Sequence, residues 1–339
     1  MVKICSMQQL KKLEKILTEQ EVHGTQREGM YNADGRPVIG RYADVLSDSG
    51  FKAVFGDVRN KEVLRVMLNE MLPLERKIDR MSLSTVEIPG MTPTGKSIRL
   101  DLHCIADDGA EFIIEMQRYN QDNFFKRCMC YASKVYSGHL EKMPKEQKRM
   151  IQDSRKIEDM EYDLKPVYLI GLMAVDLPHE KPELWDDKYI SYYTMMEKST
   201  GEIRDETISI IFVELARFGK RKEECRSKAE EWFYALKNGS SMESAPESGD
   251  KGINSFYSAC EIANFDKVKR MQYEEGIMTE YDYYSIINTA ARKGLREGKE
   301  KGGQEKALEI AQKMIANGFS TEDISELTGL AMAEIDKLM

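Results

Sequence analysis

The sequence predicts an α/β fold, a mixed sheet flanked by helices and followed by an all-helical C-terminal tail. Three observations lead to this class. Apolar residues at helical spacing precede a group of β runs, a near-continuous apolar run occupies residues 166–177, and helical periodicity dominates from residue 253 onward. Helices and strands that alternate in this way form layered α/β cores.

Composition narrows the classes of protein that fit. The chain has 339 residues, 41% hydrophobic and 32% charged, enough for a sizeable core and about two domains. No apolar stretch approaches the ~18–20 residues of a membrane helix, so we expect no membrane association. Six scattered cysteines without a CxxC pair indicate a reducing compartment, and we expect the cytoplasm. The net charge of −8 excludes a generic nucleic-acid coat protein, but residues 122–159 hold nine Lys and Arg against six Asp and Glu, which leaves a nucleic-acid enzyme open.

The first half of the chain is expected to run from helix to strand and back to helix. Residues 1–42 are interpreted as an N-terminal helix and linker, and residues 43–72 carry apolar side chains at the spacing of an amphipathic helix. Strand character follows over residues 78–118. Residues 121–150 return to a helix with aromatic and apolar side chains on one side.

The second half is expected to complete the sheet and then become helical. Residues 166–177 predict a central strand buried on both faces. Segments rich in Thr, Ile, Tyr and Val on either side of a turn at 199–202 predict another strand pair. A helix over 221–237 closes this domain. Residues 238–252 are interpreted as a flexible polar loop, and residues 253–339 as a helical C-terminal region.

A β-hairpin is the most informative local prediction. Two β runs, 97–106 and 110–118, are separated by the short acidic turn Asp107-Asp108-Gly109. If the turn is centred on Asp108, residues whose numbers sum to 216 lie opposite each other. Asp101 then lies directly across from Glu115.

The two faces of this hairpin are expected to differ, because successive side chains of a strand point to opposite faces. One face is entirely apolar and should pack into the core. Its residues are Leu100, Leu102, Cys104, Ala106, Ala110, Phe112, Ile114 and Met116. The other face carries Asp101, His103, Glu115 and Gln117.

The opposed carboxylates of Asp101 and Glu115 suggest a cation site. Cβ atoms of opposed residues lie about 5 Å apart, so the two charges repel each other unless a cation lies between them. A hard divalent ion such as Mg²⁺ takes one or two carboxylates together with waters and phosphate oxygens. Gln117 lies on the same face and would orient a water molecule or contact a phosphate. The alternative is a solvated outer face on which charged residues are ordinary.

The order Asp101, then Glu115-Met116-Gln117, resembles the signature of the PD-(D/E)XK, or restriction-endonuclease-like, nucleases. Five blocks resemble the recombination-promoting nuclease and transposase-like group of that superfamily. They are DSGFKAVFG at 48–56, LN and PLE within 68–75, FIIEMQ at 112–117, the helix start at 125–131 and KPVY at 165–168. The resemblance covers residues 43–237 and implies a restriction-endonuclease-like mixed sheet with metal-dependent phosphodiester hydrolysis at the hairpin.

The resemblance also implies roles for individual residues. Asp101 and Glu115 would ligate Mg²⁺, with Mn²⁺ as a substitute, and together with Gln117 would form the catalytic set. Gln117 stands where the superfamily usually has Lys, and it offers hydrogen bonds without a positive charge. The candidates for an additional acid from an early helix are Asp48, Glu62 and Glu70. Asp48 is favoured because it lies in a family-like block, and its alternative role is a helix N-cap.

Basic residues on the helix after the hairpin are candidates for DNA contacts. Lys126 and Arg127 would reach phosphates, and the alternative is a solvated helix face. Lys52 and Tyr131 are further phosphate candidates without independent support. His103 shares the carboxylate face and is expected to be a structural neighbour.

These observations favour a magnesium-dependent DNA endonuclease linked to recombination or mobile elements. A catalytically silent DNA- or protein-binding relative is the alternative, and a helical scaffold with a purely structural core is a third. Residues 306–338 resemble a helix-turn-helix, but the final helix lacks the Arg, Asn or Gln expected for base reading. We therefore expect packing or protein contacts from this tail, and a homo-oligomer formed through the helical C-terminal region remains open.

Overall fold

The computed structural model describes residues 39–72, 74, 77–88, 97–142, 164–177, 179, 181–185 and 188–339. Contacts divide the chain into two compact units. Met30–Met278 form the first unit. Met1–Gly29 and Thr279–Met339 form the second, of which only Thr279–Met339 is described.

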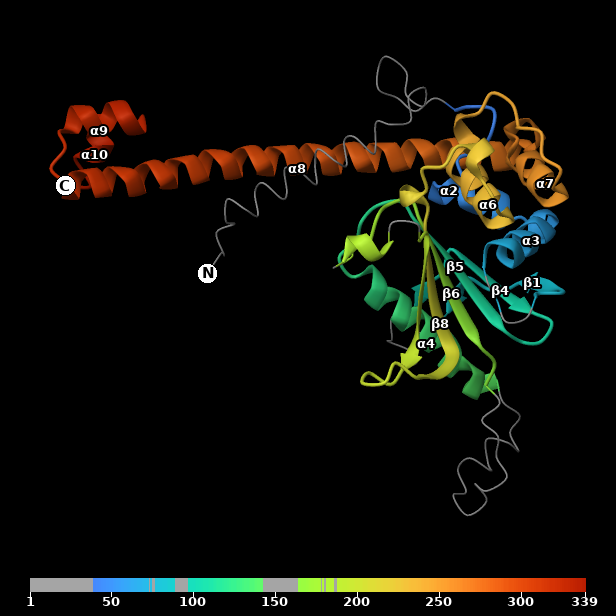
Figure 1. Cartoon of the computed structure of the whole chain (residues 1–339). Coiled ribbons are helices and arrows are strands. Elements are labelled where there is room, and N and C mark those ends of the chain that lie inside the picture. The colour runs from blue at the N-terminus through green and yellow to red at the C-terminus, as the bar shows by residue number, and fades with distance from the viewer. Residues whose placement is uncertain are drawn as a thin grey trace. The chain divides into compact units, whose positions relative to one another are not determined.

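A six-stranded mixed sheet forms the centre of the first unit (Figure 1). Its strands are β1 (Met81–Leu83), β4 (Leu102–Ala106), β5 (Glu111–Gln117), β6 (Val167–Met173), β7 (Ile190–Met196) and β8 (Ile203–Glu214). They lie in the order β1-β4-β5-β6-β8-β7, with β5, β6 and β8 parallel and the remaining pairs antiparallel. The predicted strand pair is β7 and β8, and the predicted central strand is β6, which is buried along nearly its whole length. The predicted mixed sheet with flanking helices is therefore confirmed.

The hairpin of β4 and β5 has the predicted register, but its first strand is shorter than expected. Leu102 pairs with Ile114 and His103 with Ile113, so both pairs sum to 216. The run expected over 97–106 is split into two strands. Its first part is β3 (Ile98–Arg99), which pairs with β2 (Glu87–Ile88) in a separate two-stranded sheet.

Leu100 lies on the opposite face from the one predicted. Asp101 forms a bend between β3 and β4, and this bend interrupts the alternation of side chains. Leu100 consequently packs with Ile113 and Phe124, whereas Leu102 packs with the larger core as expected. The alternation argument holds within β4 and fails one residue before the bend.

Four helices pack against one face of the sheet. They are α2 (Asp48–Phe55), α3 (Lys61–Met71), α6 (Lys228–Asn238) and α7 (Lys251–Cys260). Their buried side chains join Leu102, Phe112 and Val213 in one core. The helix expected over 43–72 is two helices, because Asp57 caps a short 3-10 turn (Val58–Asn60) between them.

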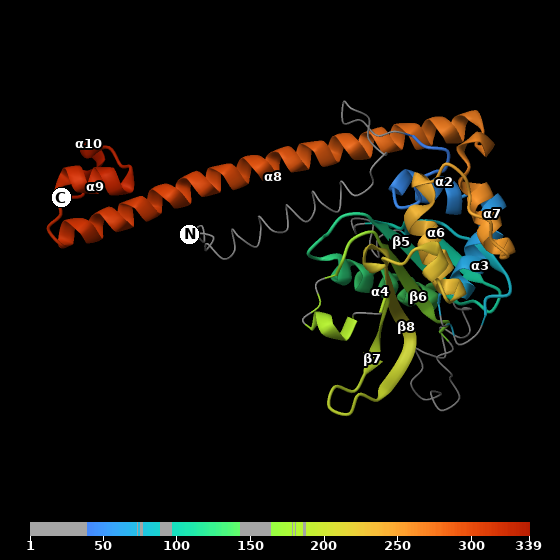
Figure 2. The same cartoon turned by 45° about the horizontal axis from the view of Figure 1, so that its top comes forward.

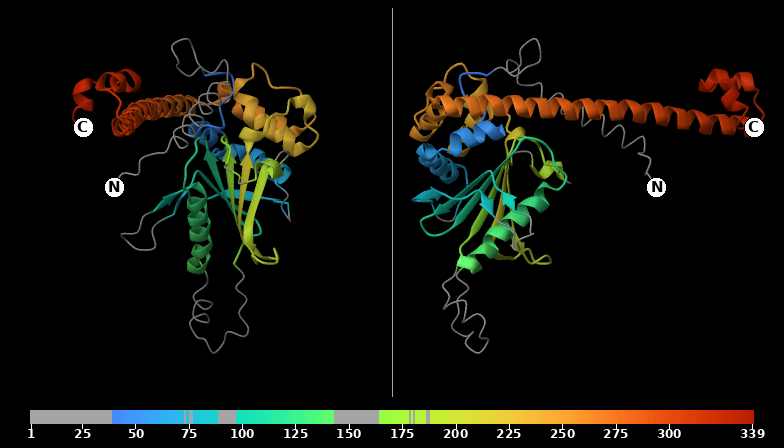
Figure 3. Two further views of the ribbon diagram at one scale, coloured as in Figure 1. Left: turned by 60° about the vertical axis from the view of Figure 1, so that its left-hand side comes forward. Right: turned by 180° about the vertical axis from the view of Figure 1, so that it is seen from behind.

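Helix α4 (Phe124–Lys142) lies along the opposite face of the sheet (Figure 3). Phe124, Cys128, Ala132 and Val135 recur at helical spacing and pack on alternate residues of the central strands. The hairpin face that carries Glu115 and Gln117 is therefore buried, which excludes the solvated outer face. The expectations for residues 1–38 and 143–150 lie outside the described residues.

The C-terminal region is helical, as predicted. α8 (Lys267–Ala316) is followed by α9 (Thr321–Thr328) and α10 (Met332–Ile335) (Figure 2). Glycines in the left-handed conformation follow α8 and α9, with φ of 79° and 73°. A small core forms between these helices from Ala311, Ile324, Leu330 and Ile335. Among the helices that the structure describes, none is both long and apolar enough to span a membrane.

Candidate active site

Asp101 and Glu115 face each other at the end of the hairpin remote from its turn. The backbone N–H of Asp101 donates to Glu115 Oε1 at 3.2 Å. In return, the backbone N–H of Met116 donates to Asp101 Oδ2 at 3.0 Å. The opposite strand therefore holds one oxygen of each carboxylate. The second oxygens, Asp101 Oδ1 and Glu115 Oε2, lie toward side chains from helices.

The pair is sheltered from solvent. The side chain of Asp101 is 21% exposed and that of Glu115 only 5%. Burial raises the pKa of Asp101 above its ordinary value. Burial, reinforced by the charge of Asp101, raises the pKa of Glu115 to about 8. Two carboxylates that are this close and this buried are stabilised when one of them binds a proton or when a cation lies between them.

Helix α2 brings a lysine to the pair. Ser47 Oγ accepts from the N–H of Gly50 and caps the helix. Lys52 and Asp48 lie one turn apart, and Lys52 Nζ is 2.5 Å from Asp48 Oδ1 and 3.6 Å from Asp101 Oδ1. Asp48 thus borders the carboxylate pair through Lys52, and its side chain is 62% exposed.

Gln117 is engaged on both ends of its amide. Its Nε2 donates to the carbonyl of Tyr119, and its Oε1 accepts from Arg127 Nη2 at 3.0 Å. The same guanidinium nitrogen lies 3.9 Å from Glu115 Oε2. Gln117 therefore positions Arg127 beside Glu115, a link that spacing in the sequence did not suggest.

Helix α4 fixes the rest of Arg127. The guanidinium carbon lies 5.0 Å from the ring centre of Phe124 and 5.9 Å from that of Tyr131. Arg127 Nη1 also donates to Gln121 at 2.5 Å. Lys126, the neighbouring candidate, is exposed on α4 and is not brought to the pair.

His103 has a structural environment. Its Nε2 is 2.5 Å from Glu111 Oε2, and its Nδ1 is 3.0 Å from the carbonyl of Thr85. His139 of α4 contacts the other oxygen of Glu111 at 2.9 Å. This buried group of hydrogen bonds joins α4 to the hairpin. His103 follows Asp101 by two residues, which agrees with the role of a structural neighbour.

A second network braces the far side of the strand end. Arg118 follows Gln117, and its Nη1 lies 2.9 Å from the buried carboxylate of Asp44. The N–H of Asp44 donates to the hydroxyl of Tyr273 in α8 at 2.9 Å. No sequence signal indicates these contacts, because Tyr273 is distant along the chain and carries no motif.

The donors of the pair fit a divalent cation. Asp101 Oδ1 and Glu115 Oε2 are hard oxygens of the kind that Mg²⁺ and Mn²⁺ take together with waters and phosphate. Within the described part of the chain, no three or more His, Cys, Asp or Glu side chains cluster as a metal site. The protein therefore offers a carboxylate pair rather than a complete cage.

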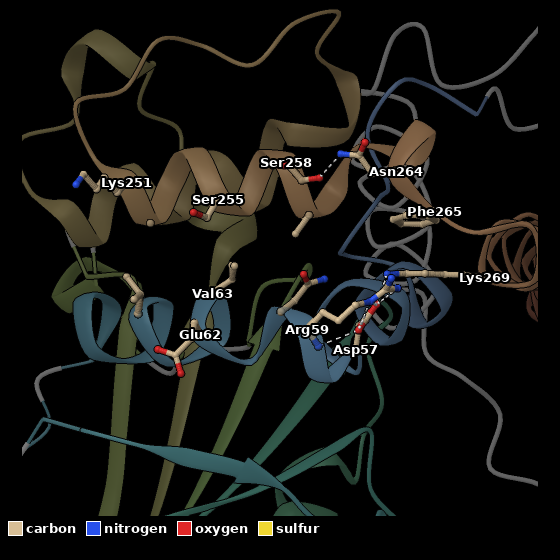
Figure 4. A pocket seen from close by; sticks show the side chains of 14 residues that line it. Asp57, Arg59, Glu62, Val63, Lys251, Ser255, Ser258, Asn264, Phe265 and Lys269 are labelled. Atoms are coloured by element: carbon tan, nitrogen blue, oxygen red, sulfur yellow. Dashed lines mark hydrogen bonds and ion pairs between the residues drawn. The ribbon is translucent and has the colours of Figure 1, made fainter.

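A cavity of about 560 Å³ lies elsewhere, between α3 and α7 (Figure 4). Three of its charged side chains pair with one another, since Asp57 contacts Arg59 at 2.6 Å and Lys269 at 2.8 Å. Neither Asp101 nor Glu115 lines it. The cavity has no part in the chemistry of the pair.

Comparison with known families agrees with this geometry. A family model described as "PD-(D/E)XK nuclease family transposase" matches residues 45–290. A second model, "Rpn/YhgA-like nuclease family, C-terminal HTH domain", matches residues 304–339. No curated protein and no solved structure matches the chain. The first model spans most of the sequence, and its match includes the hairpin, α2 and α4, so the chain belongs to the PD-(D/E)XK nuclease family of transposases.

Proposed function

We propose that this protein is a metal-dependent DNA endonuclease acting in recombination or on mobile elements. The observation that carries the proposal is the buried pair of Asp101 and Glu115, each with one oxygen held by the opposite strand. Family membership supports the nuclease class. We add to this class three specific proposals: that the reaction depends on Mg²⁺, that the substrate is DNA, and that the DNA is cut internally.

Asp101 and Glu115 would hold Mg²⁺, or Mn²⁺ in its place. When bound, the cation would act as a Lewis acid on the phosphate and lower the pKa of the attacking water. In the reaction the attacking water releases a proton to solvent as its oxygen bonds to phosphorus, one phosphorus–oxygen ester bond breaks, and the departing oxygen takes up a proton from solvent. Arg127, which donates to Gln117, would also donate to a non-bridging phosphate oxygen. Lys126, the exposed neighbour of Arg127 on α4, would contact the DNA backbone.

One observation favours a second candidate, a catalytically silent DNA- or protein-binding relative. Gln117 occupies the strand position at which the superfamily usually has Lys, and its amide is already bound by Tyr119 and Arg127. The silent reading predicts that DNA binds without being cut.

Cleavage of supercoiled plasmid tests the proposal. Wild type is incubated with Mg²⁺, Mn²⁺ or EDTA beside Asp101→Asn and Glu115→Gln. We expect nicking or cutting that requires metal and falls at least 10³-fold in both variants, because each loses a ligand charge. Asp107→Asn, in the exposed turn of the same hairpin, is the matched control and should cut like wild type. Metal-independent cutting, or full activity in Asp101→Asn, would refute the assignment.

Two features support further expectations about the setting of the protein. All five cysteines that the structure describes are free, which supports a reducing compartment such as the cytoplasm. Tyr283, Ile286 and Ile287 are exposed at helical spacing on α8, which supports self-association through the C-terminal region.

A further inference from the structure

Lys52 of α2 forms an ion pair with Asp101, one member of the carboxylate pair. Its Nζ lies 3.6 Å from Asp101 Oδ1, the oxygen that the hairpin backbone leaves free. Its side chain is 41% exposed, so the ammonium group is open to a substrate.

The strand that carries Glu115 contributes no cation of its own. β5 contains neither Lys nor Arg between Glu111 and Gln117. Arg118, directly after it, is bound to Asp44 on the far side. Among the residues that the structure describes, two helices bring positive charge to the pair, with Arg127 beside Glu115 and Lys52 beside Asp101.

Helix α2 is held firmly enough to place this charge. Its own side chains Phe51, Val54 and Phe55 are completely buried. Gly276 of α8 lies so close to α2 that a Cβ added there would collide with the Ser49 side chain. Asp48 lies one turn before Lys52 and contacts its Nζ at 2.5 Å.

We infer that Lys52 is a catalytic residue whose ammonium group binds a non-bridging oxygen of the scissile phosphate, with Asp48 as its positioning residue. This inference rests on the proposed nuclease function. A lysine at this position supplies the positive charge that stabilises the negatively charged transition state, which the neutral amide of Gln117 does not supply. The competing role is that of a counterion, in which Lys52 only neutralises Asp101.

Three variants of the full chain separate the two roles. Lys52→Gln removes the charge, and Lys52→Arg keeps it. Lys198→Gln is the matched control, because Lys198 is an exposed lysine in the β7–β8 turn, at the end of the sheet opposite to Gln117. Three quantities are measured: the cleavage rate at saturating Mn²⁺, Mn²⁺ affinity by calorimetry, and the salt dependence of binding to a labelled DNA duplex in EDTA. Tryptophan fluorescence reports folding.

A catalytic role predicts that Lys52→Gln lowers the cleavage rate by about 10²-fold, and that Lys52→Arg restores it to within about tenfold. Mn²⁺ affinity should stay equal or increase, because a competing positive charge is removed. The slope of log affinity against log salt should decrease in magnitude by about 0.9, the value for one lost phosphate contact.

The possible failures are distinguishable. If wild type cuts and Lys52→Gln cuts within threefold of it, the inference is overturned while the proposed function stands. If wild type does not cut, the proposed function fails, and the salt slope in EDTA still decides whether Lys52 contacts phosphate. A slope unchanged from Lys198→Gln overturns that contact, and a slope reduced by about 0.9 supports it.

Discussion

Glu115 combines deep burial with a nearby negative charge, and this has a cost for the folded protein without metal. Its carboxyl is 5% exposed, and Asp101 lies directly across the hairpin. Arg127 at 3.9 Å compensates only partly, since the pKa of Glu115 remains raised to about 8. A cation at the pair would relieve the burial cost and the repulsion together, so the features that disfavour the metal-free state also favour metal binding.

The stability of the metal-free protein should therefore depend on the proton at Glu115. Between the ordinary pKa of 4.5 and about 8, the folded chain binds a proton that the unfolded chain has released. The free energy of unfolding must then fall as pH rises through this interval. Glu115→Gln removes the titrating group and should stabilise the protein in EDTA by on the order of 5 kcal/mol at pH 9, with little effect at pH 5.

Thermal unfolding in EDTA at pH 5, 7 and 9 measures this effect. Each kcal/mol corresponds to about 2–4 °C in Tm for a domain of this size. Asp107→Asn controls for general effects of charge removal on the hairpin. Adding Mg²⁺ at pH 9 should raise the Tm of wild type and leave that of Glu115→Gln unchanged. A Tm difference between the two proteins that is the same at pH 5 and pH 9 would contradict the account.

At the scale of elements, the candidate site depends on how closely α4 fits the sheet. Gly171 of β6 pairs with Glu115 of β5, and the space above it is filled by rings. A Cβ at Gly171 would lie 2.7 Å from Phe212 Cδ1 and 3.3 Å from Phe124 Cε1. This glycine thus lets α4 approach the strand beside the carboxylates.

We expect Gly171→Ala to destabilise the protein by about 1–3 kcal/mol, because neither ring can move freely in a packed layer. The matched control is Gly138→Ala within α4, where an added Cβ meets nothing within 4 Å. That change should be neutral or stabilising by up to about 1 kcal/mol, since Ala is the better helix former. Denaturant unfolding compares the two, and equal midpoints would show that the contact at Gly171 is not tight.

The elements also show how far sequence alone leads. The register of the hairpin follows from its turn, because a two-fold alternation leaves no freedom once the centre is fixed. The split of the first strand at Asp101 could not be predicted from the sequence. It arises because residues 98–99 pair with β2, and no local pattern encodes that pairing. Lys52 and Arg127 appear in the sequence as ordinary helix-surface charges. Their approach to the pair depends on how α2 and α4 pack against the sheet.

At the scale of the whole molecule, charge is divided unevenly between the nuclease-like unit and the tail. The segment matched as a C-terminal HTH domain, residues 304–339, holds three basic and seven acidic residues. Phosphate contacts provide most non-specific DNA affinity, so an acidic segment contributes little to it. Its helices nevertheless share a well-defined core, in which Ile324 and Ile335 are fully buried.

Unfolding the tail should therefore leave non-specific DNA binding unchanged. Ile324→Asp places a charge in the small core and should unfold α9 and α10 without affecting the sheet, because the described residues of that core all come from the C-terminal region. Both tryptophans, Trp185 and Trp232, lie in the first unit, so their fluorescence reports the sheet unit alone. We expect the affinity of Ile324→Asp for a random duplex to stay within about twofold of wild type.

Lys126→Ala combined with Arg127→Ala provides the contrasting variant. Loss of two phosphate contacts should weaken binding and reduce the magnitude of the salt slope by about 1.8, since each contact contributes about 0.9. If Ile324→Asp instead weakens binding tenfold or more while the tryptophan signal is unchanged, the tail itself holds DNA. Contacts to the bases would then have to outweigh the repulsion between the acidic residues of 304–339 and the phosphates. Such contacts would make the tail bind a selected site more tightly than a random duplex.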